Sequence, residues 1–218
     1  GSFALDASAS AAGKGAYAAR IALDSIEIRN KHRTDRIRPT SVSLHTDSAA
    51  TRAEAASGDL SLTFSTPQSA DSLIAALTRS ARALAGQIDA QSIDMEQLKP
   101  ALPDFALRVS AGPDNILNSL LKSRKIAFDA LNAEGANCDS LPVSIRLRTE
   151  GLAYGNVVLD TVTADIRQNG KRLEYALGLA NAPGNLDNIA RAGLYGHLVR
   201  NTGPVSYTHL TLPTSDLV

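Results

Sequence analysis

The sequence predicts a mainly β protein with helical inserts and antiparallel strands. Several short stretches alternate apolar and polar residues, as strands with one buried face do. One long stretch instead repeats its apolar residues at helical spacing, which indicates an amphipathic helix within the β pattern. Aromatic residues make up only 4% of the chain and tryptophan is absent, so Ala and Leu supply most of the apolar content.

Residues 1–65 are expected to form β strands. Residues 16–29 are rich in Ile and Leu and read as one strand, and the charged residues 31–38 that follow read as a solvated turn. Two half-buried strands come next, defined by Val42, Leu44 and Thr46 in the first and by Leu60, Leu62 and Phe64 in the second.

Residues 66–103 are expected to form a helical insert. Thr66 and Pro67 supply an N-cap and a first-turn proline for a helix over residues 67–90. A second, shorter helix is expected to start at Ser92 and to stop at Pro100. The apolar stripe of the long helix comprises Leu73, Ile74, Leu77, Ala81, Leu84 and Ile88.

Residues 104–204 are expected to return to β strands with one short helix, capped by Asp114. Residues 157–166 and 172–180 are joined through Asn169-Gly170, a strong hairpin signal, because a type I′ turn needs positive φ at both central residues. A last strand is expected at residues 192–199. The pattern of an apolar residue, Asp, a small residue and an apolar residue recurs at Leu23, Phe128 and Leu159, which favours a stacked β architecture.

Period-2 spacing predicts that the strands share one apolar sheet face. Ser61, Thr63, Arg146 and Arg148 are expected on the opposite face. A smooth aliphatic face suits acyl chains, which have no polar groups to satisfy, and it suits the core of a β-sandwich equally well. The candidate lipid-groove residues are Leu60, Leu62, Phe64, Phe105, Leu107, Val109, Val143, Ile145, Leu147, Leu173, Tyr175, Leu177 and Leu179.

Composition and motifs argue against several classes of function. Lys and Arg number 22, as do Asp and Glu, so the net charge is zero and no basic stripe predicts nucleic-acid binding. The histidines are isolated, Cys138 is the single cysteine, and no nucleophile elbow or phosphate-binding loop occurs. We therefore expect no catalytic residues, no metal site and no cofactor, and we do not expect an enzyme.

Three stretches of residues 57–202 carry a family resemblance: GDLSLTFSTP, which leads into the helical insert, SIDMEQLKPALPDFALRVSAGPDNILNSLLKSRKIAFDAL, and GNVVLDTVTADIRQNGKRLEYALGLANAPGNLDN. In these stretches the chain resembles the TamB-type translocation and assembly proteins of Bacteroidota, in the wider AsmA-like superfamily. These motifs are patterns of structure rather than catalytic signatures.

The resemblance implies an elongated, groove-like sheet, a β-taco or repeating β-groove, in a bridge across the periplasm. Such a bridge is anchored in the inner membrane through an N-terminal segment that this chain does not include. Its expected partners are phospholipid acyl chains and, through another absent segment, an outer-membrane barrel of the TamA/BamA type. The expected role is phospholipid transfer between the two membranes, support of outer-membrane protein assembly, or both. Because the helix at residues 73–88 is not a general feature of such grooves, it is expected to be a lid or a lineage-specific insert.

The alternative is a secreted or surface β-sandwich used for adhesion or glycan binding. The scarcity of aromatic residues and the lack of an acidic calcium loop argue against it.

Residues 205–218 resemble a translated sequencing adapter, and Gly1 is not an initiator Met. The chain is therefore interpreted as an internal fragment of a longer protein, with a tail that is dispensable for folding.

Overall fold

The structure is a computed structural model of the chain. It describes residues 4–11, 13, 15–24, 26–29, 34–89, 93–155, 157–181, 191–199 and 203–211. In residues 26–29, 34–37, 191–199 and 203–211 only the backbone is described.

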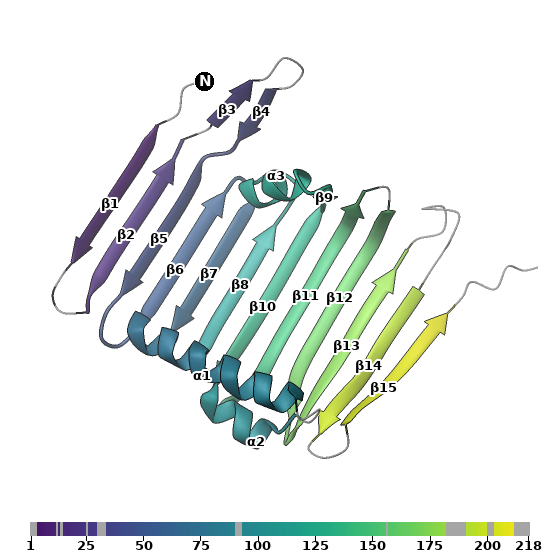
Figure 1. The fold of residues 1–218 in the computed structure, drawn as a ribbon. Coiled ribbons are helices and arrows are strands. Elements are labelled where there is room, and N and C mark those ends of the chain that lie inside the picture. Colours follow the sequence, from purple (N-terminus) through teal and green to yellow (C-terminus); the bar gives the residue numbers. More distant parts are fainter. Residues whose placement is uncertain are drawn as a thin grey trace, which may run out of the picture.

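One long antiparallel sheet dominates the molecule (Figure 1). Its strands run in the order β1-β2-β5-β6-β7-β8-β10-β11-β12-β13-β14-β15, with β9 also paired to β11. At a strand spacing of about 4.8 Å, this path is roughly 50 Å long. The strand bounds are β1 Leu5–Ala11, β2 Tyr17–Leu23, β5 Thr40–Thr46, β6 Thr51–Ser57, β7 Leu60–Thr66, β8 Phe105–Ala111, β9 Ile126–Ala127, β10 Ala130–Cys138, β11 Leu141–Tyr154, β12 Val157–Asn169, β13 Arg172–Ala180, β14 Arg191–Val199 and β15 Gly203–Thr211.

The sheet is open, so the predicted class, mainly β with helical inserts and antiparallel pairing, is confirmed. Every neighbour along the path pairs antiparallel, from β1 with β2 to β14 with β15. Pairing of β14 with Gly203–Thr211 carries the sheet into the segment that resembles an adapter.

Helices interrupt the sheet at two points in the chain. Between the paired strands β7 and β8 lie α1 (Ala70–Asp89), α2 (Met95–Leu98) and the 3-10 turn η1 (Lys99–Ala101). Between β8 and β9 lies α3 (Ile116–Lys122). In Figure 1, α1 crosses the lower ends of the strands and α3 lies at their upper ends. No helix in the described ranges is both long and apolar enough to cross a membrane.

The starts of α1 and α3 differ from the sequence predictions. Thr66 ends β7, and α1 begins at Ala70, where the hydroxyl of Ser69 accepts a hydrogen bond from the Ser72 amide at 3.3 Å. Asn115, rather than Asp114, caps α3, since its side chain accepts from the Asn118 amide. For α2 the cap is Asp94, and the predicted start at Ser92 lies outside the described residues.

Two loops also differ from their predictions. The predicted solvated turn at residues 31–38 contains a strand, because β3 (Ile26–Arg29) and β4 (Thr34–Ile37) form a separate two-stranded hairpin. In the β12–β13 hairpin Asn169 pairs with Arg172, so the two turn residues are Gly170 and Lys171. Only Gly170 of these two has a positive φ, 60°, which fits a type II′ turn rather than type I′.

Candidate apolar binding face

The apolar face of the sheet consists of every second residue in successive strands. Leu62 lies opposite Val109 and Phe64 opposite Leu107, while Leu107 in turn lies opposite Gly135. The predicted register is confirmed, and Ser61, Thr63, Arg146 and Arg148 lie on the other face. This face includes all the candidates named from the sequence: Leu60, Leu62, Phe64, Phe105, Leu107, Val109, Val143, Ile145, Leu147, Leu173, Tyr175, Leu177 and Leu179.

Much of this apolar face is open. Ile145, Leu177 and Leu179 are 43%, 43% and 42% exposed, although their neighbours across the strands are also apolar. On the other side of the helical insert, Val42 and Leu44 are 44% and 40% exposed. A sandwich core would bury such side chains beneath a second layer, and the described residues place no second sheet over them.

Two parts of the apolar face are sealed by helices. Leu60 is 9% exposed and forms a buried cluster with Ala111 and Phe128, against which residues of α3 pack. Val143 is 6% exposed and forms another cluster with Met95 and Leu98 of α2. Leu60 and Val143 are therefore core residues, whereas the exposed side chains of β5, β11 and β13 lie outside these two covered zones.

A polar network fixes α3 to one end of the apolar face. The side-chain amide of Asn115 donates to Asp59 Oδ1 at 2.6 Å and to the Gly112 carbonyl at 2.7 Å. Asn118 donates to the Phe128 carbonyl at 2.8 Å and accepts from the Phe128 amide at 3.2 Å. Both asparagines are 1% exposed, so these bonds satisfy groups that burial would otherwise leave without partners.

Hydroxyl groups anchor the helical insert at the opposite end. The side chains of Thr46 and Thr51 share a hydrogen bond of 2.8 Å, and Thr46 Oγ1 also accepts from the Ala70 amide at 3.0 Å. Thr51 donates to the Gln68 carbonyl at 2.8 Å. Strand residues of the apolar face thus become polar where a helix must be attached, and remain aliphatic between the attachments.

Charge around α3 favours ionised carboxylates. The hydrogen bond from Arg38, reinforced by its charge, lowers the pKa of Asp114 below its ordinary value. Burial tends to raise the pKa of Asp59, but the Asn115 amide and the backbone amides of Asp114 and Gly112 outweigh it and lower that pKa.

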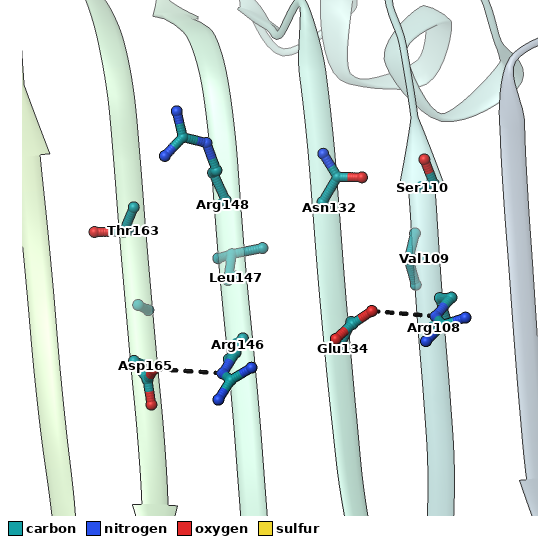
Figure 2. Close-up of a pocket in the computed structure, with 11 residues that line it drawn as sticks. Arg108, Val109, Ser110, Asn132, Glu134, Arg146, Leu147, Arg148, Thr163 and Asp165 are labelled. Atoms are coloured by element: carbon teal, nitrogen blue, oxygen red, sulfur yellow. Dashed lines mark hydrogen bonds and ion pairs between the residues drawn. The ribbon is translucent and has the colours of Figure 1, made fainter.

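The opposite, polar face carries pairs of opposite charge across neighbouring strands. Arg108 contacts Glu134 at 3.2 Å, and Arg146 contacts Asp165 at 3.5 Å. They border a shallow hollow of about 690 Å³ over β8, β10, β11 and β12. Figure 2 shows the charged side chains on the near side of the strands, with Leu147 and Val109 behind them. These pairs are exposed and their charges neutralise each other, so they hydrate this face and leave little net charge to attract a charged ligand.

The histidine, cysteine and acidic side chains of the described residues are the candidates for a metal site. No cluster of three or more His, Cys, Asp and Glu side chains there could hold a metal ion. His45 lies 3.8 Å from Asp47 at an exposed position, and His32 lies outside the described residues. A hydrogen bond with the Ser140 side chain lowers the pKa of Cys138, a half-buried free thiol at the end of β10.

The apolar face is larger than the sequence candidates suggested. Register places Ile21 opposite Val42, Val42 opposite Ala55, and Leu44 opposite Ala53, which extends the face through β2, β5 and β6. In β12, Val162, Ala164 and Ile166 fill the gap between Leu147 and Leu177. Their alternation was visible in the sequence, but alanine and threonine blur it because they are common on both faces of a strand.

Comparison of the chain with protein-family models, curated proteins and solved structures gives no match. The reading of the apolar face therefore rests on the chain's own residues.

Proposed function

We propose that this chain is a segment of a lipid-transfer bridge, in which the open apolar face of the sheet takes up the acyl chains of phospholipids. The observation that carries the proposal is a set of aliphatic side chains on the apolar face of β5, β11 and β13 that stay 40–44% exposed, namely Val42, Leu44, Ile145, Leu177 and Leu179. Leaving so much aliphatic surface in water costs free energy, at roughly 25 cal/mol per Å². An exposed apolar surface of this extent usually marks a binding site.

Acyl chains fit this surface better than ligands that need directional contacts. Between the helix attachments, the face presents methyl and methylene groups from residues such as Leu62, Leu107 and Leu147. It offers few hydrogen-bonding groups there to orient a sugar or a peptide. A polymethylene chain requires none, and it can slide along such a surface without breaking polar contacts.

The resemblance to TamB-type proteins supports the same role and supplies its setting. In that setting the chain lies in the periplasm within a protein anchored in the inner membrane, and lipid passes toward an outer-membrane barrel of the TamA/BamA type. The chain binds and guides lipid without chemical change, and support of outer-membrane protein assembly is a further role of the same bridge.

Photocrosslinking at two adjacent residues of β13 tests the proposal. Leu177 lies on the apolar face and Ala176 on the polar face, and both are exposed. A photoreactive residue at Leu177 should form phospholipid adducts in the intact bacterial envelope, while one at Ala176 should form none. Equal labelling at both residues, or no adduct at Leu177, would contradict lipid uptake by this face.

A further inference from the structure

Helix α1 is held to the protein mainly by small and polar side chains, with Leu73 half-buried on the same side. Ala76 is 2% exposed and Ser80 is 8% exposed, and the Ser80 hydroxyl donates to the Ala101 carbonyl of η1 at 2.5 Å. One turn later, Ala83 packs against the buried cluster of Met95, Leu98 and Val143. The buried side of α1 is therefore not its most hydrophobic side.

The most hydrophobic side of α1 is open. Ile74, Leu77, Leu84 and Ile88 are 62%, 52%, 40% and 59% exposed. Together with Ala81 they recur at intervals of three and four residues, so they form one stripe along the whole helix, called here the α1 stripe.

The α1 stripe faces the open part of the sheet. At about 100° per residue, it lies about 100° around the helix from the buried row of Ala76, Ser80 and Ala83, in the direction in which the chain winds. In Figure 1, α1 runs from left to right across the lower strand ends, with α2 below it. Seen from its start, a right-handed helix winds clockwise. Its buried row contacts η1 and the cluster that includes Met95 and Leu98 of α2. The clockwise turn from that row carries the stripe toward the side of α1 that overlooks the apolar face.

The ends of α1 fix its course along the sheet. The Ala70 amide bonds Thr46 of β5, while Ala83 packs on the cluster that contains Val143 of β11. A helix of 20 residues is about 30 Å long. The stripe therefore runs crosswise to the strands, along the length of the apolar face.

We infer that the α1 stripe is a side wall of the lipid path, in contact with the same acyl chains as the sheet. This inference rests on the proposed function and assigns the helical insert a part in it. In place of the expected lid or lineage-specific insert, it makes the helix a wall that runs beside the lipid path. The stripe is left in water because its partner is the lipid, as for Leu177 on the sheet.

Acyl chains suit the space better than a second copy of the helix does. The wall and the sheet are both aliphatic, and in this arrangement the lipid path lies between them. The charged residues Arg79 and Arg82 lie on the far flank of α1, both exposed. A paired helix would cover the stripe alone and leave Ile145 and Leu177 exposed, whereas acyl chains between the two surfaces cover both.

Photocrosslinking within α1 tests the inference, with Leu177 as a reference for the proposed function. The probes are a photoreactive residue at Leu77 or Leu84, on the stripe, and one at Ala75, exposed on nearly the opposite side of the same helix. The full purified chain is mixed with vesicles of phosphatidylethanolamine and phosphatidylglycerol that carry radiolabelled acyl chains. Circular dichroism and thermal melting verify that each variant is folded.

The expected result is a lipid adduct at Leu77, Leu84 and Leu177 and none at Ala75. Adducts at Leu177 without adducts on the stripe would contradict the assignment of the stripe as a side wall and leave the proposed function standing. Loss of adducts at Leu177 as well would overturn both. Crosslinks between two protein chains through Leu77, or equal lipid labelling at Ala75, would also overturn the wall, since the stripe would then be a dimer contact or would have no selectivity.

Discussion

At the scale of single residues, buried polar side chains decide where helices attach to the sheet. Asn118 is the clearest case, because its amide group satisfies both the amide and the carbonyl of Phe128. A hydrocarbon side chain of similar size would fill the space but leave two buried backbone groups without partners. The pattern also explains why the α3 cluster contains polar residues beside Leu60 and Phe128.

Replacing Asn118 by Ala should destabilise the protein by roughly 2–4 kcal/mol, because two buried backbone groups lose their partners. The measurement is urea-induced unfolding followed by circular dichroism. Asn132→Ala, at an exposed position of β10, is the matched control and should change the free energy of unfolding by less than about 0.5 kcal/mol. Equal effects of the two changes would show that the Asn118 contacts contribute little.

Acid should loosen α3 through Asp59 and Asp114. Both carboxyl pKa values are lowered in the folded protein, so their stabilisation is complete above the unfolded pKa and is lost as the pH falls through the folded pKa. Amide hydrogen exchange in residues 116–122 should therefore accelerate relative to β11 between about pH 5 and about pH 3.

Asp59→Asn removes one of these titrating groups and is the test of the cause. In this variant, the hydrogen-exchange rate of the α3 amides should depend less on pH over this interval than in the unaltered protein. An unchanged acid response in the variant would assign the effect to other groups.

At the scale of elements, strand positions were more predictable than helix orientation. The alternation of Leu60, Leu62 and Phe64 with polar residues gives a strand and its inward face directly, because a strand has only two faces. A helix has no such restriction. The sequence identified the stripe of Leu77 and Leu84, but the buried side is the row of Ala76 and Ser80, which only the partner η1 selects.

Local signals also failed where a neighbour in space decides the outcome. Asp114 is a good capping residue, yet its carboxylate pairs with Arg38 and leaves the cap to Asn115. The charged residues 31–38 resembled a turn, yet part of them pairs with β3 as β4. Neither Arg38 nor the β3 backbone could be identified as a partner from local sequence.

Because the α1 stripe is exposed and Ala76 is buried, changes on the stripe should affect the free energy of unfolding less than a change at Ala76. Leu77→Ser and Leu84→Ser should each change the free energy of unfolding by less than about 1 kcal/mol, because these side chains are mostly in water. Ala76→Leu should lower it by about 1–3 kcal/mol, because the space beside Ala76 is filled. The measurement is thermal melting with circular dichroism as a check of helix content. A large loss from Leu77→Ser with a tolerated Ala76→Leu would reverse the assigned faces.

At the scale of the whole molecule, the open sheet distributes stability along its length. Each strand contacts chiefly its two neighbours, as in repeat proteins, so a change at one margin has little effect on the far side. The extent of the sheet could be anticipated from repeated alternation. The strands that flank the helical insert in sequence, β7 and β8, are neighbours in the sheet, so the insert does not interrupt the order of strands.

Removing residues 205–218 should therefore leave most of the molecule unchanged. Within the sheet this segment contributes to β15, which pairs with β14 alone. The melting temperature should shift by no more than about 4 °C, the change that about 1 kcal/mol produces in a protein of this size. A loss of cooperative unfolding in the truncated chain would mean that this strand is essential to the sheet.

The most direct test of the central claim compares Leu177→Asp with Ala176→Asp. The two residues are neighbours on β13, both exposed, and they lie on opposite faces of the sheet. Phospholipid bound per protein is measured after incubation with vesicles, alongside the melting temperature of each variant. If the apolar face is an open lipid path, both variants fold, and only Leu177→Asp loses lipid. If it is a sealed core, Leu177→Asp costs several kcal/mol of stability because it buries an unpaired charge. That loss of folding, or equal lipid binding by the two variants, would contradict the account.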